Sequence, residues 1–230
     1  MVEISALESE AIRLSLRVAV WSVLTSLPVG LFTAWLLARR DFPGKTVLNG
    51  LVHLPLVLPP VVVGYLLLVL LGRDGPLGRL LLDLFGVSLP FTWQGAALAA
   101  AVMAFPLMVR AMRLSLEAVD RRLEAAARTL GASPPVVFAT VTLPLMAPGI
   151  VVGALLAFAR SLGEFGATIT FAANIPGETR TLPLALYSLT QTPGGEAAAL
   201  RLAALSVLLS LVALAASEIV ARRVQTRIGG

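Results

Sequence analysis

Residues 124–144 read EAAARTLGASPPVVFATVTLP, a charged, helix-forming start that runs through Gly-Ala-Ser-Pro-Pro into an apolar block ending in Leu-Pro. The run AAARTL favours a helix. Gly131 can take the left-handed conformation that ends a helix, and Pro134 and Pro135 prevent its continuation. The small side chains of residues 125–127 let another protein's backbone approach closely. The stretch therefore predicts a short, abruptly ended helix shaped for docking, with a helix that merely caps an apolar bundle as the alternative.

The residues before this stretch, RAMRLSLEAVDRRL, also have a helical pattern. Apolar side chains recur at helical spacing with charges between them, which is typical of an amphipathic helix; they are Met112, Leu116, Val119 and Leu123. We expect this segment to lie outside the apolar part of the molecule.

The composition indicates a membrane protein. Of the 230 residues, 57% are hydrophobic and only 13% are charged, whereas roughly a quarter of an average soluble domain is charged. The chain has no cysteine and a single histidine, His53, which excludes disulfides, thiolate metal sites and His-rich metal sites. The sequence pI is near 10.9, but the basic residues lie between apolar blocks rather than on one soluble face, so no nucleic acid is expected as a partner.

Long uncharged runs predict five membrane spans in a single transmembrane domain over residues 1–230. A helix needs about 20 apolar residues to cross the hydrocarbon core, and one Arg or Asp at its centre costs roughly 2.5–3.5 kcal/mol. Such runs separate Arg17 from Arg39, Lys45 from Arg73, Asp83 from Arg110 and Arg128 from Arg160. A fifth uncharged run, residues 202–217, can be lengthened by residues 197–200 across Arg201, whose long side chain can reach the interface. The predicted spans are 14–38, 47–71, 86–109, 136–159 and 197–221. The prolines around His53 are expected to kink the second span.

The distribution of Lys and Arg predicts the orientation in the membrane. With five spans, one side of the membrane holds eleven basic residues and the other holds seven, and the richer side is cytoplasmic. We therefore expect the amino terminus outside, the carboxyl terminus in the cytoplasm, and residues 124–135 on the cytoplasmic side. The first ten residues carry Glu3, Glu8 and Glu10 rather than a basic segment, so the first apolar run is taken as structure and not as a cleaved signal.

Residues 164–196 fit no span, because acidic residues, prolines and a Gly-Gly pair interrupt them. Two apolar runs, TITFAAN and LPLALYSL, nevertheless lie within them. Non-helical backbone survives at membrane depth only where protein buries it or a watery cavity receives it. The segment is predicted to be an external loop that partly re-enters the membrane, with an ordinary surface loop as the alternative.

The opening stretch resembles the cytoplasmic motif of membrane subunits of ATP-binding-cassette (ABC) importers: Glu-Ala-Ala, three residues, Gly, nine residues, Ile, one residue, Leu-Pro. Here nine residues follow Gly131, Val141 replaces the Ile, and Leu143-Pro144 completes the pattern, while the acid, Glu124, lies one position early. The resemblance implies the type I ABC importer permease fold, in which this motif is a coupling helix that docks on a cytoplasmic ATPase. The implied docking residues are Glu124, Ala125, Ala126, Ala127, Arg128, Thr129, Leu130 and Gly131.

A second resemblance concerns the substrate. SLGEFGATITF, NIPGETRTLPLALY and QTPGGEAA are very similar to the same region of molybdate-importer permeases. The resemblance implies transport of molybdate handed over by an external or periplasmic binding protein, with tungstate, sulfate or thiosulfate as alternative ions. The chain would sit in the inner membrane and bind no cofactor, since ATP and Mg²⁺ belong to the ATPase. Five spans are few to enclose a path, so a homodimer with ten spans is expected.

Polar residues near the fourth span are candidates for the pathway or its gate, although Ser and Thr in membrane helices often bond their own backbone. The candidates are Ser161, Glu164, Thr168, Thr170 and Asn174. Glu164 is either part of a hinge and seal or the structural partner of Arg160 one helical turn back. Glu178 and Arg180 are candidates for contact with the binding protein.

A membrane enzyme and a secondary carrier are the two other classes of protein that an apolar, multi-span chain could represent. A membrane enzyme is disfavoured because the sequence has no HExxH, GxSxG or CxxC motif and no phosphate-binding GxxxxGK[ST] loop. A self-sufficient secondary carrier is typically built from internal repeats, and none is evident. Such a carrier would transport without an ATPase.

Overall fold

The fold is entirely helical over residues 5–228, the part of the chain that the computed structural model describes. The first four and last two residues of the predicted domain lie outside it. The elements are α1 (Ala6–Arg39), α2 (Lys45–Val57), α3 (Pro60–Leu71), α4 (Pro76–Phe85), α5 (Trp93–Ala118), α6 (Arg121–Thr129), α7 (Pro134–Val137), the π-helical η1 (Phe138–Thr142), α8 (Leu143–Leu162), α9 (Gly166–Phe171), α10 (Leu182–Thr190) and α11 (Glu196–Ile228).

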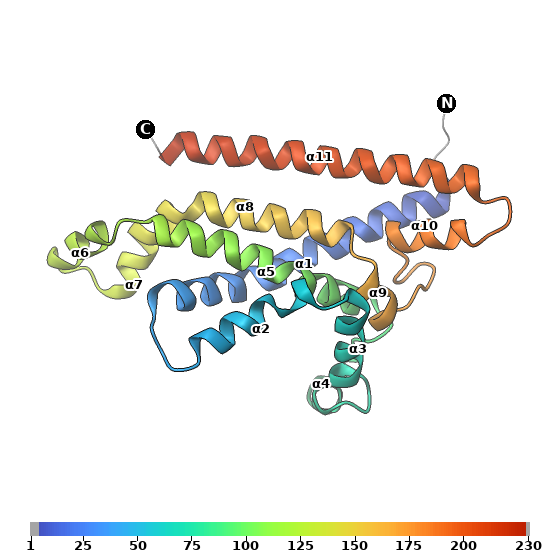
Figure 1. Ribbon diagram of the computed structural model, residues 1–230, viewed down its shortest axis with the longest axis horizontal. Coiled ribbons are helices and arrows are strands. Elements are labelled where there is room, and N and C mark those ends of the chain that lie inside the picture. Colours follow the sequence, from blue (N-terminus) through green and yellow to red (C-terminus); the bar gives the residue numbers. More distant parts are fainter. Residues whose placement is uncertain (1–4, 229–230) are drawn as a thin grey trace.

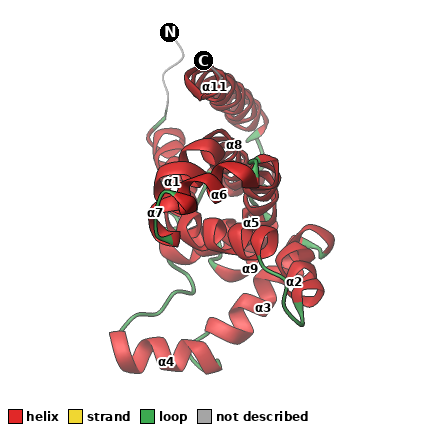
Figure 2. Cartoon of the chain, turned by 90° about the vertical axis from the view of Figure 1, so that its left-hand side faces the viewer, coloured by secondary structure: helices red, strands yellow, loops and turns green. Residues whose placement is uncertain are grey.

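Four long helices, α1, α5, α8 and α11, run along the length of the molecule (Figure 1). The short α6 and α7 lie at one end of this bundle and α9 and α10 lie towards the other; we call these the α6 end and the α10 end. Helices α3 and α4 project to one side, as Figure 2 also shows. In the described residues four helices are long and apolar enough to cross a membrane, or five if the bent pair α2–α3 counts as one span. The predicted all-helical membrane fold is confirmed.

Helix α1 begins well before the predicted span 14–38. Ser5 caps it, since its side chain accepts the backbone N–H of Glu8 while the Glu8 carboxylate accepts the backbone N–H of Ser5, the reciprocal pair of a capping box. The resulting 34 residues extend over about 51 Å. This exceeds the roughly 30 Å of hydrocarbon, so α1 projects beyond the membrane.

The predicted second span is two helices rather than one. The helix axis bends by 119° between α2 and α3, at Leu58 and Pro59. Proline supplies no N–H and forces the residue before it into extended conformation, and Leu58 has the corresponding ψ of 143°. The expected kink is therefore present, and it is sharp enough to separate two elements.

Helix α5 differs from the predicted third span at both ends. It starts at Trp93 rather than residue 86, where the Thr92 side chain accepts the N–H of Gly95. It then continues to Ala118 and absorbs most of the amphipathic segment that we expected outside the bundle. The prediction was wrong there because Met112 and Leu116 are buried in the core beside Met146 of α8, which keeps the helix in the bundle.

Small residues let α8 pack closely on α5. Gly149 and Gly153 are spaced as in the small-xxx-small pattern of membrane helix pairs. A Cβ on Gly149 would overlap the side chain of Ser115, and one on Gly153 would lie 2.9 Å from the carbonyl oxygen of Met108. Because lipid offers no hydrophobic drive for helices to associate, this close contact is a main source of stability.

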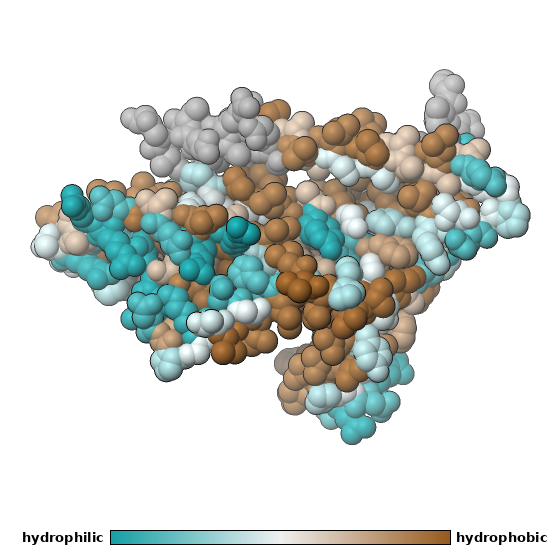
Figure 3. Space-filling view, viewed as in Figure 1, coloured by the Kyte–Doolittle hydropathy of each residue, from teal (hydrophilic) through white to brown (hydrophobic). Residues whose placement is uncertain are grey.

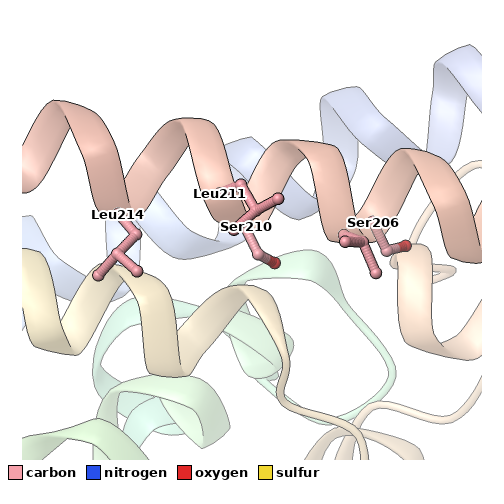
Figure 4. A pocket seen from close by; sticks show the side chains of 5 residues that line it. Ser206, Ser210, Leu211 and Leu214 are labelled. Atoms are coloured by element: carbon pink, nitrogen blue, oxygen red, sulfur yellow. The ribbon is translucent and has the colours of Figure 1, made fainter.

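The remaining spans follow the predictions more closely. The fourth covers α7, η1 and α8, from Pro134 to Leu162, and is interrupted by the π-helical turn. The fifth, α11, packs on α8 and α10 but leaves most of its apolar side chains exposed. Figure 4 shows Ser206, Ser210, Leu211 and Leu214, which line a shallow groove along α11.

Replacement of Gly153 by valine is expected to destabilise the isolated protein. Overpacking of a close helix contact costs typically 1–3 kcal/mol, so the unfolding midpoint in detergent should fall by roughly 2–12 °C. The matched control is Gly50→Val in α2, where an added Cβ meets nothing within 4 Å. The midpoints are measured by thermal unfolding. Equal falls in the midpoint for the two variants would contradict the packing argument.

Candidate functional site

The short helix α6 ends as the sequence predicted. Asp120 caps its start by accepting the N–H of Arg122. At its other end Gly131 has φ of 88°, its N–H bonds to Arg128 O, and Ala132 N–H reaches back to Ala127 O. This pair of bonds is the Schellman motif, which needs a left-handed residue at the position of Gly131. The helix therefore ends at Thr129, and a short loop leads from there to Pro134.

One face of α6 is exposed, and no residue of the helix is buried. The Leu130 side chain is the most exposed large apolar side chain here, with 88% of its surface accessible. Six of the eight predicted docking residues share this exposure and Ala127 is half-buried; the exposed ones are Ala125, Ala126, Arg128, Thr129, Leu130 and Gly131. The helix therefore presents Leu130 and its smaller neighbours to the surroundings rather than to the bundle.

Glu124 does not lie on that exposed face. Its Oε1 accepts a hydrogen bond from Arg39 Nη2 at 2.9 Å and another from Thr142 Oγ1 at 2.8 Å. The Glu124 side chain is only 14% exposed and that of Arg39 only 11%. The carboxylate thus joins α6 to the last residue of α1 and to η1. Sequence reasoning missed Arg39 and Thr142 as its partners, because 85 and 18 positions separate them from Glu124.

The loop after α1 adds further charge at the α6 end. Lys45 donates to Asp41 at 2.8 Å. This hydrogen bond and the positive charge of Lys45, with a smaller contribution from Arg121, hold the pKa of Asp41 below its ordinary value. Figure 3 shows hydrophilic residues gathered at the α6 end on the face in view.

Near the other end, Ser161 and Ser22 link α8 to α1. Their hydroxyl oxygens are 2.8 Å apart, and both residues are buried. Ser161 therefore has a partner within the chain, which the sequence did not reveal. The contact places the end of α8 beside α1 five residues from Arg17.

Glu164 lies at the break between α8 and α9 and is almost fully buried, with 2% of its side chain exposed. Its Oε2 is 2.6 Å from Arg160 Nη1, which confirms the predicted ion pair. Its Oε1 also accepts the N–H of Ala167 at 2.9 Å. The carboxylate therefore satisfies a backbone donor at the start of α9, a role that the sequence did not show.

Helix α9 is held against α3 by two glycines. A Cβ on Gly64 would lie 2.6 Å from Ala167 O, and one on Gly166 would lie 2.7 Å from Pro60 Cβ. Thr168 is buried, and Thr170 Oγ1 donates to Gly166 O four residues back. Thr170 thus bonds its own helix, the alternative considered for such residues.

The last three candidates support the chain between α9 and α10. Arg180 Nε donates to Asn174 Oδ1 at 3.0 Å, and Asn174 Nδ2 donates to Ser188 Oγ at 2.7 Å. Glu178 Oε1 accepts the N–H of Trp93 at 3.2 Å. The predicted external loop is therefore largely ordered by internal bonds and contains two helices. Beside Arg180 lies a small cavity also lined by Glu10 and Gly177.

Among the side chains that the structure describes, those of residues 5–216 and 219, no group of three or more His, Asp or Glu is arranged to hold a metal ion. The candidates thus fall into two sets. At the α6 end they form an exposed helix with one carboxylate that faces inward, and towards the α10 end they lie around the break between α8 and α9 and hydrogen-bond within the chain. No cluster of a nucleophile, base and orienting group accompanies either set in the described contacts.

Comparison with known proteins agrees with this arrangement. The molybdenum transport system permease protein ModB of Escherichia coli (strain K12) is 62% identical over 222 residues, covering 96% of this chain and 97% of that protein. The sulfate transport system permease protein CysW of Synechococcus elongatus is 40% identical over 201 residues, covering 86% of this chain and 70% of that protein.

A solved structure shares the fold. A bacterial ABC transporter involved in the import of the polysaccharide alginate superposes with a TM-score of 0.75, at 17% identity, over 95% of this chain and 80% of that one. The family model of binding-protein-dependent transport system inner membrane components matches residues 26–226. The chain therefore belongs to the family of inner membrane components of binding-protein-dependent transport systems, the non-catalytic permease subunits of ABC importers.

Proposed function

We propose that this protein is the membrane subunit of an ATP-driven importer that passes molybdate from an external binding protein into the cell. The observation that carries the proposal is the 62% identity to a molybdenum permease over almost the whole chain. Sulfate, tungstate or thiosulfate is the alternative substrate, and the sulfate permease is the less similar relative.

Two aromatic–cation contacts on α1 support its position in the membrane. Arg17 lies over the ring of Trp93 at 3.6 Å, beside Trp21, and Arg40 lies over Trp35 at 5.2 Å. Tryptophans collect at the two membrane–water interfaces, and arginines near helix ends extend their side chains towards them. Arg39 follows Arg17 by 22 positions, a rise of about 33 Å in a helix, which is close to the thickness of the hydrocarbon.

The proposed orientation puts the α6 end in the cytoplasm. It is supported by the excess of Lys and Arg on that side, eleven against seven. The exposed face of α6, with Leu130 projecting from it, would then meet a cytoplasmic ATPase. The chain would bind no ATP or Mg²⁺ itself, because its sequence has no phosphate-binding GxxxxGK[ST] loop.

A homodimer is proposed because candidate pathway residues of one chain are already hydrogen-bonded to other groups of the same chain. The bonds of this kind are those of Ser161, Thr170 and Asn174. They leave these side chains only weak contacts for an anion, which suits a path that passes the anion without holding it. Exposed apolar side chains on α2 and α3, such as Leu51, Val57 and Leu66, leave surface for lipid and for a second copy. Two copies would place two α6 helices beneath one central path.

The external binding protein is proposed to contact the α10 end. Glu178 and Arg180 are half-buried there and held by hydrogen bonds within the chain. Their side chains therefore have fixed positions at the surface. Rigid contact surfaces lose less conformational entropy on binding, which supports a role in reception of the binding protein.

Uptake measurements test the proposed function. Vesicles that contain this protein with its ATPase, supplied with the binding protein, should accumulate molybdate only when ATP is present. A tenfold excess of sulfate should reduce the rate less than twofold, whereas the same excess of tungstate should compete. Equal uptake by vesicles that lack the ATPase would indicate a secondary carrier.

Single-cysteine labelling tests the orientation and the docking surface, because the chain has no natural cysteine. Ala126→Cys should resist a membrane-impermeant maleimide in intact cells and react in inverted vesicles. Bound ATPase should slow that reaction at least fivefold. The control is the exposed Gln191→Cys at the α10 end, which should show the opposite accessibility. Labelling of Ala126→Cys from outside would overturn both assignments.

Glu164→Gln tests whether this acid is structural. The amide can still accept the Ala167 N–H, but Arg160 loses its charged partner. We expect a loss of about 1–3 kcal/mol, less than for a fully buried pair because Arg160 is partly exposed. Molybdate uptake should stay within about threefold, because the hydrogen bond from the Ala167 N–H at the start of α9 is kept.

The double variant Arg160→Gln/Glu164→Gln should recover at least half of the lost stability in thermal unfolding. The exposed pair Arg113–Glu117 supplies the control, since Glu117→Gln should cost under about 0.5 kcal/mol. Abolished uptake in a normally stable Glu164→Gln protein would instead assign Glu164 to the gate.

A further inference from the structure

We infer that Glu124, Arg39 and Thr142 form a clasp that makes α6 move together with the end of α1 and the start of α8. Glu124 is on this view a positioning residue that transmits motion, and it does not touch the ATPase. The inference rests on the proposed function, because it assigns the link through which motion of a docked ATPase reaches the spans.

The low exposure of the clasp, 11% for the Arg39 side chain and 14% for that of Glu124, separates it from ordinary surface pairs. Both of its bonds end on the same oxygen, Glu124 Oε1, and Thr142 is only 3% exposed. The other ion pairs at this end, Lys45–Asp41 and Arg113–Glu117, are partly or fully exposed and join residues four apart in the chain. A charge-assisted bond in a water-poor site is stronger and more strictly directed than an exposed pair.

Helix α6 has little else to hold it. None of its residues is buried, and it contacts the rest of the described chain mainly through η1 and α7. It is joined to α5 by a two-residue break at Val119 and Asp120, and to α7 by the turn at Gly131. Without the clasp, a force on α6 would bend these joints before it displaced a span.

The two partners of Glu124 are placed where displacement matters. Arg39 is the last residue of α1, which packs along α5 and α8. Thr142 is the last residue of η1, where the helix runs in π geometry before α8 begins. A π-helical turn has weaker, wider bonding and is often found at functional sites. The clasp therefore links α6 both to α1, a continuous helix, and to the π-helical turn at which the span that contains α8 is interrupted.

The first measurement needs no ATPase. A spin label on Ala126→Cys in the otherwise cysteine-free protein reports the mobility of α6. Adding Glu124→Ala or Thr142→Val should increase that mobility, and Asp41→Asn, which alters an exposed pair nearby, should not. Unchanged mobility in both clasp variants would overturn the clasp.

The second measurement compares molybdate uptake with ATP hydrolysis in vesicles that hold the complete complex. Glu124→Ala should keep the ATPase in normal stoichiometry and hydrolysis within twofold, because the residue faces inward, while uptake per ATP falls at least tenfold. Thr142→Val, which removes one bond and keeps the side-chain shape, should lower that ratio two- to fivefold. Glu124→Gln, which keeps an acceptor oxygen, should retain at least half of it.

The outcomes separate the clasp from the proposed function. Normal uptake per ATP in both Glu124→Ala and Thr142→Val would overturn the transmission role. Loss of ATPase from the Glu124→Ala complex would show that Glu124 is a docking residue instead. A wild-type complex without ATP-driven uptake would reject the proposed function, while the spin-label result would still decide whether the clasp holds α6.

Discussion

Backbone hydrogen bonding in a medium without water is the constraint on which the rest of the structure depends. Within hydrocarbon each N–H and C=O needs a partner inside the protein, so the chain crosses as helices and every interruption must be compensated. The interruptions in this protein lie at Pro59, at Gly163 and at the π-helical turn before α8. At the second of these the Glu164 carboxylate accepts the Ala167 N–H, so a side chain replaces the missing helical bond.

The same constraint explains why the bundle is built from small side chains. Since lipid is as apolar as leucine, helices adhere by close packing rather than by escape from water. Gly149 and Gly153 bring α8 onto α5, and alanines of α5 fill much of the interior. Such a contact resists sliding, so α1, α5 and α8 are expected to move as a unit when one of them is displaced.

Two carboxylates that face inward perform parallel tasks at opposite ends of this unit. Glu124 and Glu164 each form an ion pair with an arginine, and each accepts a hydrogen bond from a further group, the Thr142 hydroxyl or the Ala167 N–H. Each also fastens a short helix, α6 or α9, to a long one. A short helix cannot bury enough apolar surface to hold itself in place, and a directed, charge-assisted bond supplies what packing cannot. Each carboxylate thereby keeps a short helix in register with the spans.

The sequence by itself determined the membrane class, the approximate spans, the end of α6 at Gly131 and the pairing of Arg160 with Glu164. All of these follow from uncharged runs, local backbone conformation or contacts within one helical turn. Only the tertiary structure decided that α5 extends through Leu116, that Ser22 meets Ser161, and that Glu124 turns inward to Arg39 and Thr142. The reason is physical: these features depend on which helices lie side by side, and hydropathy measures the affinity of a segment for lipid without specifying its neighbours.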